Sequence, residues 1–555
     1  MSIKNIATRN EFADYLNIKR KTLTYVLYEA GVNSFYQSFD IPKKDGSARH
    51  IYAPTGALKT IQKKLADALY DYQKNIKSET NIKTNISHAF EKEKGIITNA
   101  QIHRNKRYII CLDLKDYFES FHFGRVMGFF ENNRNYKLSH EVAVIIAQIA
   151  CYNGFLPQGA PSSPVITNLI SQIMDSHLLK ICKKYHLDYT RYADDLTFST
   201  NDKNFLDKKD AFIEEVSFEI ESSGFSINDS KTRIVFRDSQ QVVTGLIVNK
   251  KLNVPRSYYK NTRAMWRSFY TTGNYLIDGQ QGTVNQLEGR FSFIDLIEHY
   301  NNIVDLSGAK HRDTCLSAKE REYRNFLFYI HFINNNKPVL ITEGKTDVLY
   351  IKAALKNLYA EYPSLISKNS NGKFTFRISF FNRTRHWKYF FGMSKDGADA
   401  MKKLYSFFSG NGDNNLCQYF KKQNAIFSNK PVFFLFDNEL NSKRPLRAFI
   451  SSAKLTRVQE TELKETNHTI LNEDSKLSLL SVPLPSGKDE CELEDLFDEK
   501  TLSTVIDGRT FSRKDEDIKK YYNKNIFSKY VYKNYRQIDF SAFRPLLNIM
   551  TELIK

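Results

Sequence analysis

The order of hydrophobic and polar positions predicts two regions of different architecture along the 555-residue chain. In the first region, apolar residues recur with helical spacing, and short apolar runs between them are typical of buried strands. We expect short helices before residue 35 and a hairpin at 39–52 whose turn is Asp45-Gly46. The other expected elements are helices at about 58–76, 123–150, 165–185, 205–223 and within 255–330, a strand at 108–112, and strands on both sides of residues 194–195.

A polar, proline-bearing break at 334–338 introduces the second region. After it strands and helices alternate, an order that is typical of a parallel α/β sheet. These elements are expected at 339–342, 346–358, 374–381, 397–408, 431–436 and 477–482. The sequence therefore predicts a multidomain protein with α+β and α/β parts. Its expected divisions are a first domain at 1–315, a linker at 316–336, an α/β domain at 337–500 and a basic, aromatic, helical extension of that domain at 501–555.

The charge of the chain narrows the class of partner. Lys and Arg outnumber Asp and Glu so that the formal net charge is +19. Such an excess favours a polyanion such as nucleic acid, and a merely soluble basic protein is the alternative. The six cysteines show no CxxC pairing and are expected to be reduced thiols of a cytoplasmic protein. We expect no secretion signal and no membrane span, because no long apolar run occurs.

Two adjacent aspartates, Asp194 and Asp195, stand among apolar and β-prone residues. Two like charges destabilise an ordinary strand, whereas a divalent cation offsets them and prefers hard oxygen ligands. Asp113 ends the apolar strand at 108–112 and adds a third carboxylate, while Asp116 is expected to be a solvated or helix-capping acid. Three carboxylates suffice for two Mg²⁺ ions, which stabilise both the attacking and the leaving oxygen of a phosphoryl transfer. An ordinary turn is the alternative for the pair by itself.

Four other residues are candidates for substrate contact. Gln158 and Gly159, in a proline-rich loop, offer an amide and a close backbone approach, although such a run is usually only a loop. Lys231 is a candidate to neutralise or protonate departing pyrophosphate, with a surface lysine as the alternative. Phe118 is a candidate to pack under an incoming sugar and exclude its 2′-hydroxyl, and a core phenylalanine is equally compatible with the spacing.

The segments that carry Asp113, Gln158-Gly159, Asp194-Asp195 and Lys231 resemble, in this order, motifs A to D of reverse transcriptases. Two further segments resemble signatures of retron reverse transcriptases. They are Asn99-Ala100-Gln101-Ile102-His103, which resembles NAxxH, and Val243-Thr244-Gly245, which resembles VTG. The stretch that begins at Arg49 resembles the fingers segment of this family. The resemblance covers about 1–315 and implies a right-hand polymerase with fingers, palm and thumb, in which these residues contact substrate.

The resemblance also implies a reaction and its partners. A retron reverse transcriptase is an RNA-directed DNA polymerase that uses dNTPs and binds its own structured noncoding RNA. It starts DNA synthesis from the 2′-hydroxyl of a guanosine, and its product is multicopy single-stranded DNA (msDNA) linked to RNA. A group II intron-like or other mobile-element reverse transcriptase is the alternative. The two retron signatures weigh against it, as does the absence of an HNH or zinc-binding tail from the sequence.

A second group of acids follows apolar strands of the C-terminal region. Glu343 ends one strand, Asp347 lies in the first turn of the next helix, and Asp437 and Glu439 follow a later strand. Parallel strands place their carboxyl ends on one edge of a sheet, so Glu343, Asp437 and Glu439 are expected to converge on Mg²⁺ or Mn²⁺. Solvated acids at strand ends are the alternative. The cluster at 492–497 is a candidate for a further ligand, but it is more typical of an acidic first helical turn.

Residues 337–500 resemble the Toprim domain of topoisomerases, primases and overcoming-lysogenization-defect nucleases. Glu343 matches the glutamate of that family, Asp347 its trailing aspartate, and Asp437 with Glu439 its DxD pair, in which Glu439 replaces the second aspartate. Together the two resemblances imply a retron reverse transcriptase fused to a Toprim nuclease effector of anti-phage defence. Its target is a nucleic acid, its RNA–DNA product restrains it, and a homo-oligomer is compatible with it. The alternative is a non-catalytic platform that organises RNA or protomers.

Overall fold

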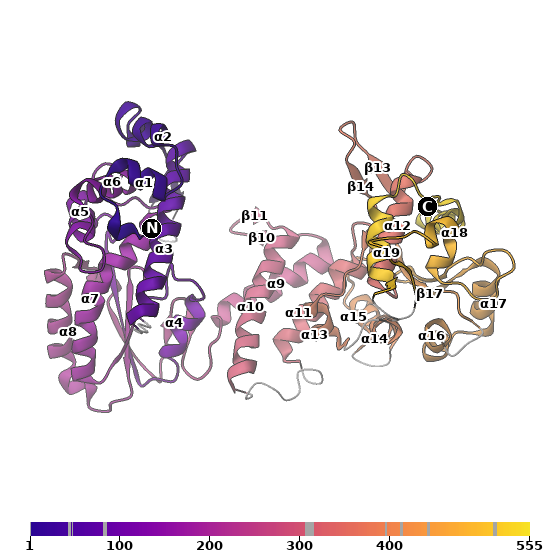
Figure 1. The fold of residues 1–555 in the computed structure, drawn as a ribbon. Coiled ribbons are helices and arrows are strands. Elements are labelled where there is room, and N and C mark those ends of the chain that lie inside the picture. The colour runs from indigo at the N-terminus through magenta and orange to yellow at the C-terminus, as the bar shows by residue number, and fades with distance from the viewer. Residues whose placement is uncertain are drawn as a thin grey trace. The chain divides into compact units, whose positions relative to one another are not determined.

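The computed structural model describes residues 2–42, 46, 48–80, 86–305, 316–393, 397–410, 414–440, 444–513 and 519–555. The chain forms two compact units, Met1–Arg256 and Ser257–Lys555 (Figure 1). This division comes before the expected boundary at 315, because residues of the helices after 256 share a hydrophobic core with the C-terminal region. Of the described helices, none is both long and apolar enough to cross a lipid bilayer.

An antiparallel five-stranded sheet forms the centre of the first unit. Its central strand, β3 (Tyr108–Lys115), is almost wholly buried, as its continuous apolar run predicts. β3 pairs with β5, β6 and β7, and β4 pairs with β5. The bounds of these strands are Asp188–Tyr192 for β4, Asp195–Thr200 for β5, Ser226–Ile227 for β6 and Arg233–Phe236 for β7.

Helices enclose this sheet in one hydrophobic core. Pro164 lies in the first turn of α7, where its missing N–H leaves no helical hydrogen bond unmade. The helix ends at His186, which adopts the left-handed conformation typical of a helix C-terminus. The helices are α4 (Ile96–Ile102), α5 (Phe123–Asn132), α6 (His140–Ala150), α7 (Ser163–Tyr185) and α8 (Phe205–Ser222), and α7 and α8 run side by side (Figure 1).

The N-terminal segment packs on the same core. Thr8 caps its first helix by accepting a hydrogen bond from the backbone N–H of Glu11. The hairpin expected at 39–52 is confirmed, and Gly46 in its turn has φ +85°, whereas Asp45 lies outside the described residues. The elements are α1 (Arg9–Tyr15), α2 (Arg20–Thr24), β1 (Tyr36–Pro42), β2 (Ala48–Pro54) and the long α3 (Gly56–Thr80).

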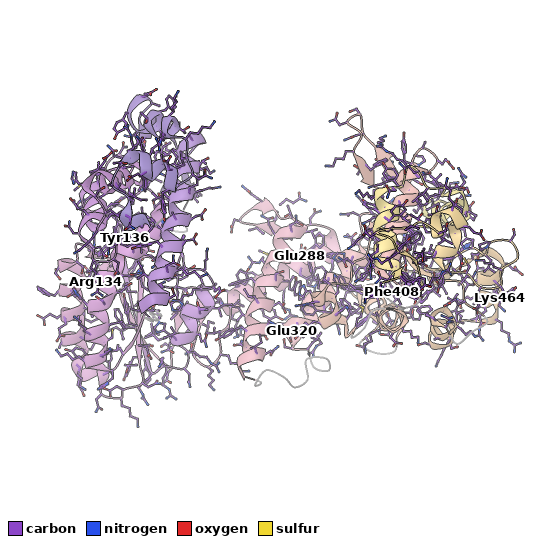
Figure 2. All side chains as sticks on the ribbon, viewed as in Figure 1. Arg134, Tyr136, Glu288, Glu320, Phe408 and Lys464 are labelled. Atoms are coloured by element: carbon purple, nitrogen blue, oxygen red, sulfur yellow. The ribbon has the colours of Figure 1, made fainter. Side chains whose placement is uncertain are left out.

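Helices α9 (Arg256–Thr272), α10 (Val284–Asp305) and α11 (Ala318–Phe328) lead into the second unit, and α11 continues as a π-helical turn to Ile333. The expected linker at 316–336 is wrong, because this segment belongs to the core. Phe328 is fully buried, and its ring centre lies 4.8 Å from that of Phe408, which is labelled in Figure 2. Six aromatic residues fall between 323 and 332 counting His331, and their apolar surface explains why the segment is buried rather than extended.

A second five-stranded sheet, in the order β15-β12-β16-β18-β17, forms the centre of the second unit. The first four strands are parallel, and β17 joins the edge in the antiparallel direction. The parallel α/β sheet expected after residue 339 is thus present. The strand expected at 374–381 is divided, because only its end joins this sheet and its beginning forms a hairpin with β13. The strands are β12 (Val339–Thr342), β13 (Ile366–Lys368), β14 (Phe374–Phe376), β15 (Ser379–Phe380), β16 (Val432–Phe436), β17 (His468–Asn472) and β18 (Leu477–Ser481).

Two hydrophobic cores lie on the two faces of this sheet. Phe434 and Phe436 of β16 belong to one core, and the alternate residues Phe433 and Leu435 belong to the other, as the two-residue period of a strand requires. The extension at 501–555 packs into the second core, where α19 lies against α12. The helices of this part are α12 (Lys345–Asn357), α13 (Arg385–Phe391), α14 (Ala398–Ser409), α15 (Leu416–Lys422), α16 (Pro445–Ala453), α17 (Arg457–Thr466), α18 (Glu499–Leu502), α19 (Lys524–Lys533) and α20 (Arg544–Ile554).

Candidate functional site

The turn that carries the two adjacent aspartates connects β4 to β5. Only Ala193 and Asp194 lie between the paired residues Tyr192 and Asp195. Ala193 has φ +56°, a left-handed conformation that costs a residue with a Cβ roughly 1–2 kcal/mol. The backbone N–H of Leu114 donates to the carbonyl oxygen of Asp194 at 3.0 Å. The turn is therefore held against β3 in a strained conformation.

Asp113, Asp194 and Asp195 lie together at this edge of the sheet. Asp113 is the register partner of Asp195 on the neighbouring strand and is only 7% exposed. Desolvation, reinforced by the charge of Asp113, raises the pKa of Asp194. Desolvation and then repulsion from Asp194 and Asp113 raise the pKa of Asp195 to about 6, although Asp195 as a whole residue is exposed. The carboxylates thus repel one another, and a cation placed between them stabilises their ionised forms.

A lysine already neutralises part of this charge. The Nζ of Lys231 lies 2.9 Å from Oδ1 and 3.0 Å from Oδ2 of Asp113, and this hydrogen bond is the main cause that raises the pKa of Lys231. Lys231 is therefore at the carboxylate centre rather than on an unrelated surface. Asn228, which the sequence did not suggest, donates from Nδ2 to Oδ1 of Asp113 at 3.1 Å.

The donor set fits Mg²⁺ by its chemistry. Among the described residues, no three His, Cys, Asp or Glu side chains already form a metal-binding group. The three aspartates nevertheless offer hard carboxylate oxygens whose mutual repulsion a divalent ion relieves. Because Lys231 binds both oxygens of Asp113, an ion at Asp113 requires this ammonium group to move away.

The loop with Gln158 and Gly159 packs directly on β2. The backbone N–H of Tyr52 donates to the carbonyl oxygen of Gln158 at 2.8 Å. Gly159 has φ +112°, and a Cβ at this position would lie 2.8 Å from both the carbonyl oxygen of Tyr52 and Cγ2 of Ile51. Only glycine tolerates this conformation and this approach. The close backbone approach expected at Gly159 is thus made to the hairpin that carries Arg49.

Arg49 and Phe118 remain candidates for substrate contact. Arg49 is exposed, and its charge opposes the upward shift of the pKa of Asp194, so it lies near the carboxylates. Phe118 is partly buried, and its ring centre lies 5.6 Å from that of Tyr117 and 6.4 Å from that of Phe90. Phe118 therefore has a packing role in addition to the predicted sugar contact.

The predicted substrate contacts of Asn99 and His103 are not compatible with their surroundings. Both residues are fully buried. The ring of His103 forms hydrogen bonds of 2.7 Å with the hydroxyls of Ser199 and Thr190, on β5 and β4. Burial lowers the pKa of His103 to about 3, so the ring is neutral. His103 therefore links the end of α4 to strands β4 and β5 and does not contact substrate.

The second signature segment forms a tight turn beside α4. Thr244 and Gly245 connect β8 (Val242–Val243) to β9 (Leu246–Ile247), and both have positive φ, +45° and +81°. The hydroxyl of Thr244 donates to the carbonyl oxygen of Ile96 at 3.3 Å. Val243 is buried, so it packs in the interior. The two retron-like signatures, distant in sequence, thus form one structural unit.

A buried ion pair between Arg191 and Asp175 supports the aspartate turn. The sequence did not suggest this pair. Arg191 is fully buried and donates from Nε and NH2 to the two carboxylate oxygens of Asp175 at 2.9 and 2.8 Å. Its NH1 donates to Tyr117 Oη at 3.1 Å, Asn168 Oδ1 at 3.1 Å and the carbonyl oxygen of Ala193 at 3.3 Å. Burial lowers and Asp175 raises the pKa of Arg191, and the net shift is upward. The guanidinium therefore fixes the strained residue of the turn.

The second group of acids lies at the carboxyl ends of two neighbouring parallel strands. Glu343 follows β12 and Asp437 follows β16, and these strands pair directly. Asp347, in the first turn of α12, accepts a hydrogen bond from the backbone N–H of Gly344 at 2.7 Å. Glu439 is 6% exposed and lies 3.4 Å from Arg444. The structure therefore brings the predicted acids to one edge of the sheet.

The charges of these acids act on one another. Desolvation, then Asp347 and Glu439, raise the pKa of Glu343 to about 7. Desolvation, with a contribution from Glu494, raises the pKa of Asp347 to about 6. Desolvation and then Asp347, Glu494 and Glu343 raise the pKa of Asp437 strongly, and desolvation also raises the pKa of Glu439. Such convergent shifts are typical of a functional site.

Glu494 and Lys524 complete this second centre. Glu494 is 1% exposed, accepts a hydrogen bond from Tyr350 Oη at 3.2 Å and lies 3.1 Å from Nζ of Lys524. Lys524 also lies 3.2 Å from Glu492. The segment at 492–497 is an acidic helical turn, as expected. Its buried residue Glu494 also adds a carboxylate to the second centre. Lys524 was missed because it comes from the C-terminal extension, and its sequence neighbourhood resembles other basic, aromatic stretches.

The second centre also fits a divalent cation. Oε2 of Glu343 is buried and has no hydrogen-bond partner among the described residues. A buried, unpaired carboxylate oxygen is costly unless a cation or a proton binds it. Hard oxygen ligands from Glu343, Asp437 and Glu439 suit Mg²⁺ or Mn²⁺. The ammonium group of Lys524 supplies part of the compensating charge.

The raised pKa of Glu343 predicts a pH-dependent stability. The group ionises at about 7 in the folded protein, against an ordinary value of 4.5. Between these values the folded state binds more protons than the unfolded state, so stability falls as pH rises towards 7 and levels off above it. The urea midpoint of the second unit should show this fall, and Glu343→Gln should reduce it. The exposed Glu473→Gln is the control, and an unchanged slope in Glu343→Gln would contradict the assignment.

Comparison with known proteins identifies relatives of the region that contains the first centre. Residues 41–252 match the family model described as reverse transcriptase (RNA-dependent DNA polymerase). The chain is 30% identical over 309 residues to the retron Ec86 reverse transcriptase of Escherichia coli, which covers 55% of this chain and 87% of that protein. It is 32% identical over 245 residues to the retron Mx65 reverse transcriptase of Myxococcus xanthus, which covers 41% of this chain and 55% of that protein. An apo telomerase structure from Candida tropicalis aligns with a TM-score of 0.31 and 14% identity over 54% of this chain and 61% of the other.

Proposed function

Because this chain belongs to the family of retron reverse transcriptases, we propose that its first carboxylate centre is the catalytic site of an RNA-directed DNA polymerase. The observation that carries this proposal is the convergence of Asp113, Asp194 and Asp195 at a strained turn. All three lie in the region, 41–252, that matches the reverse transcriptase family model. Two Mg²⁺ ions bound by these carboxylates would supply the Lewis-acid chemistry of nucleotidyl transfer.

The surrounding residues position the reactants in this proposal. The exposed Arg49 attracts the triphosphate of the dNTP, and the loop at Gln158 and Gly159 fixes the hairpin that carries Arg49. Lys231 leaves Asp113 and neutralises or protonates the departing pyrophosphate. The partly exposed ring of Phe118 packs under the incoming sugar and excludes a 2′-hydroxyl.

The proposal extends to a template and a product of the retron type. The chain uses its own structured noncoding RNA as template, starts from a guanosine 2′-hydroxyl and makes msDNA linked to that RNA. The net charge of +19 supports a polyanionic partner of this kind. The unit formed by α4 and the turn at Thr244 and Gly245 acts through the shape it gives to the protein surface, since Asn99 and His103 are buried.

The second centre acts as a Toprim nuclease effector in this proposal. Its parallel sheet places Glu343, Asp437 and Glu439 at one edge, where a bound Mg²⁺ or Mn²⁺ would activate the hydrolysis of a nucleic acid. The longer side chain of Glu439 changes the geometry relative to the usual aspartate. In anti-phage defence, the RNA–DNA product restrains this effector until infection disturbs the product.

One alternative concerns the class of the polymerase, and the other concerns whether the second centre is catalytic. A group II intron-like enzyme is disfavoured by 30% identity over 87% of a retron reverse transcriptase. A non-catalytic platform gains support from Lys524, whose ammonium group already lies among the acids of the second centre. Cleavage of nucleic acid by the purified full chain with Mg²⁺ or Mn²⁺ separates an effector from a platform.

Replacement of Asp194 by asparagine tests the polymerase site. Asp194→Asn removes a charged ligand at the metal-binding turn, so DNA synthesis from the noncoding RNA and dNTPs should fall more than about 100-fold. The matched control is Asp116→Asn, because Asp116 is exposed and follows the same strand. Primer extension by both purified variants measures the difference. Full synthesis by Asp194→Asn would show that the first centre is not the polymerase site.

Replacement of Glu343 by glutamine tests the effector. Glu343→Gln keeps the shape of the side chain and removes the charge, so both nuclease activity and toxicity of the unrestrained protein should be lost. Glu473→Gln, at an exposed position of the same unit, should retain both. Growth of expressing cells and cleavage of DNA and RNA by the purified chain are the readouts. Toxicity and cleavage that persist in Glu343→Gln would contradict the nuclease assignment.

A further inference from the structure

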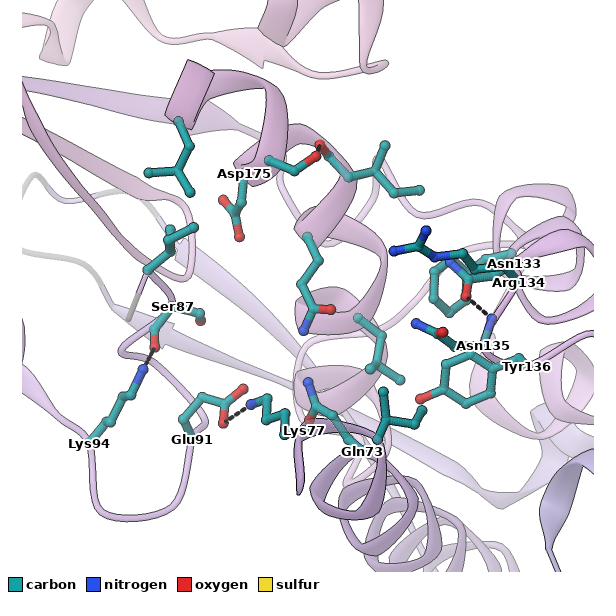
Figure 3. A pocket seen from close by; sticks show the side chains of 18 residues that line it. Gln73, Lys77, Ser87, Glu91, Lys94, Asn133, Arg134, Asn135, Tyr136 and Asp175 are labelled. Carbon is teal, nitrogen blue, oxygen red and sulfur yellow. Dashed lines mark hydrogen bonds and ion pairs between the residues drawn. The ribbon is translucent and has the colours of Figure 1, made fainter. Parts of the chain in front are cut away.

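A cavity of about 630 Å³ lies in the first unit, and none of the three catalytic aspartates lines it (Figure 3). Its walls come from α3, the end of α5 with the loop after it, α7, and the segment at 86–94. Figure 3 shows Asn135 and Tyr136 on the opposite side of the cavity from Ser87 and Lys94. The volume is within the range of sites that bind small molecules.

Two buried polar atoms of the cavity wall have no partner among the described residues. They are Nε2 of Gln73 and the hydroxyl oxygen of Tyr136. Gln73 is 6% exposed and Tyr136 is 2% exposed, so bulk water does not solvate them freely. A buried donor without a partner destabilises the protein, and folded proteins retain few of them. These two groups therefore indicate a ligand with polar atoms on its edge.

The charged residues of the cavity favour an anionic group on that ligand. Lys77 pairs with Glu91 at 3.1 Å, and Asp175 is paired with Arg191. Lys94 donates to the carbonyl oxygen of Ser87 at 3.0 Å, and Arg134 is exposed at the rim (Figure 3). The lining contains three basic residues, Lys77, Lys94 and Arg134, against two acids, Glu91 and Asp175, so its net charge is positive.

The remaining lining consists of apolar walls and amide side chains. The apolar residues are Ile76, Ile86, Phe129, Leu169, Ile173 and Leu179, and the further amides are Gln172, Asn133 and Asn135. Apolar walls with a few polar groups suit a flat heterocycle whose edge forms hydrogen bonds. We propose that this cavity binds a nucleotide, with the base against Gln73 and Tyr136 and the phosphate near the exposed Arg134 on the same side of the cavity. Its source is either a free nucleotide or an unpaired nucleotide of the bound RNA.

A ligand in this cavity would also contact residues that hydrogen-bond with the Arg191 network beside the aspartate turn. Asp175 lines the cavity and binds Arg191, which in turn donates to the carbonyl oxygen of Ala193. Ser87 also lines it and donates to Oδ1 of Asn168, a second partner of Arg191. A bound nucleotide therefore contacts two residues of the network beneath Asp194 and Asp195. Only the RNA source depends on the proposed function, because binding of a free nucleotide is independent of DNA synthesis.

Conservative variants separate a ligand site from a merely structural role. Gln73→Leu and Tyr136→Phe remove the unpartnered donors and retain most of the packing. If the groups serve a ligand, the urea midpoint of the free protein should stay the same or rise, while binding weakens about tenfold. Calorimetric titration of the full chain with AMP, GMP, CMP and UMP measures binding. Gln240→Leu and Tyr28→Phe, at exposed positions elsewhere in this unit, should change neither quantity.

A crosslinking experiment distinguishes the two sources. The full chain is bound to 4-thiouridine-substituted RNA, irradiated, and its crosslinked peptides are identified by mass spectrometry. Crosslinks to the peptides around 129–136 or 172–179 that decrease in Tyr136→Phe identify the RNA as the source. If a mononucleotide binds in the calorimetric titration but these peptides do not crosslink to RNA, the source is a free nucleotide. The proposal is overturned if no mononucleotide binds and these peptides do not crosslink, or if the variants lower stability and leave binding unchanged.

Discussion

The buried ion pair of Arg191 and Asp175 is the interaction on which the first centre depends. A fully buried guanidinium is stable only if its charge and its donors are satisfied, and here Asp175 binds it through both carboxylate oxygens. The remaining nitrogen donates to the carbonyl oxygen of Ala193, the residue with left-handed backbone in the aspartate turn. The hydrogen bond from Arg191 thus helps to offset the strain of the turn and the repulsion among its aspartates.

Both acidic centres are organised in a similar way. In the first, Lys231 binds Asp113, and in the second, Lys524 binds Glu494 and Glu492. Each ammonium group comes from a segment that follows the acidic strands by more than thirty residues. The charge of this ammonium group lowers the repulsion among the neighbouring acids. At the first centre the proposed metal ion would replace Lys231 at Asp113, whereas at the second centre Lys524 contacts Glu494 and Glu492 beside the proposed ligands.

The sequence was most informative where function depends on local geometry. Asp194 and Asp195 were predicted from a hairpin pattern, and Glu343 and Asp437 from the rule that parallel strands end at one edge. The ion pair of Arg191 and Asp175 was not predicted, because sixteen positions separate its partners and a tertiary contact between a strand and a helix joins them. Glu494 and Lys524 were uncertain or missed for the same reason.

Some expectations were wrong for identifiable physical reasons. His103 belongs to a signature that suggested substrate contact, but its two ring nitrogens bind hydroxyls of the sheet, a pattern that no local sequence feature reveals. The linker at 316–336 was inferred from a polar break, whereas the aromatic residues before the break place it in the core. The parallel sheet of the second unit and the helices of the first unit, by contrast, were predicted from hydrophobic periodicity and the order of the elements.

We propose that Arg191 holds the aspartate turn in the conformation that DNA synthesis requires. The most direct test is the rate of the first nucleotide addition by folded Arg191→Lys at saturating dNTP. Lysine cannot reach Asp175 and Ala193 together, so we predict a rate at least about tenfold lower. The control is Arg125→Lys, which alters a partly buried arginine bound to loop carbonyls elsewhere in the same unit. Equal rates in both folded variants would show that Arg191 does not set the conformation of the aspartate turn.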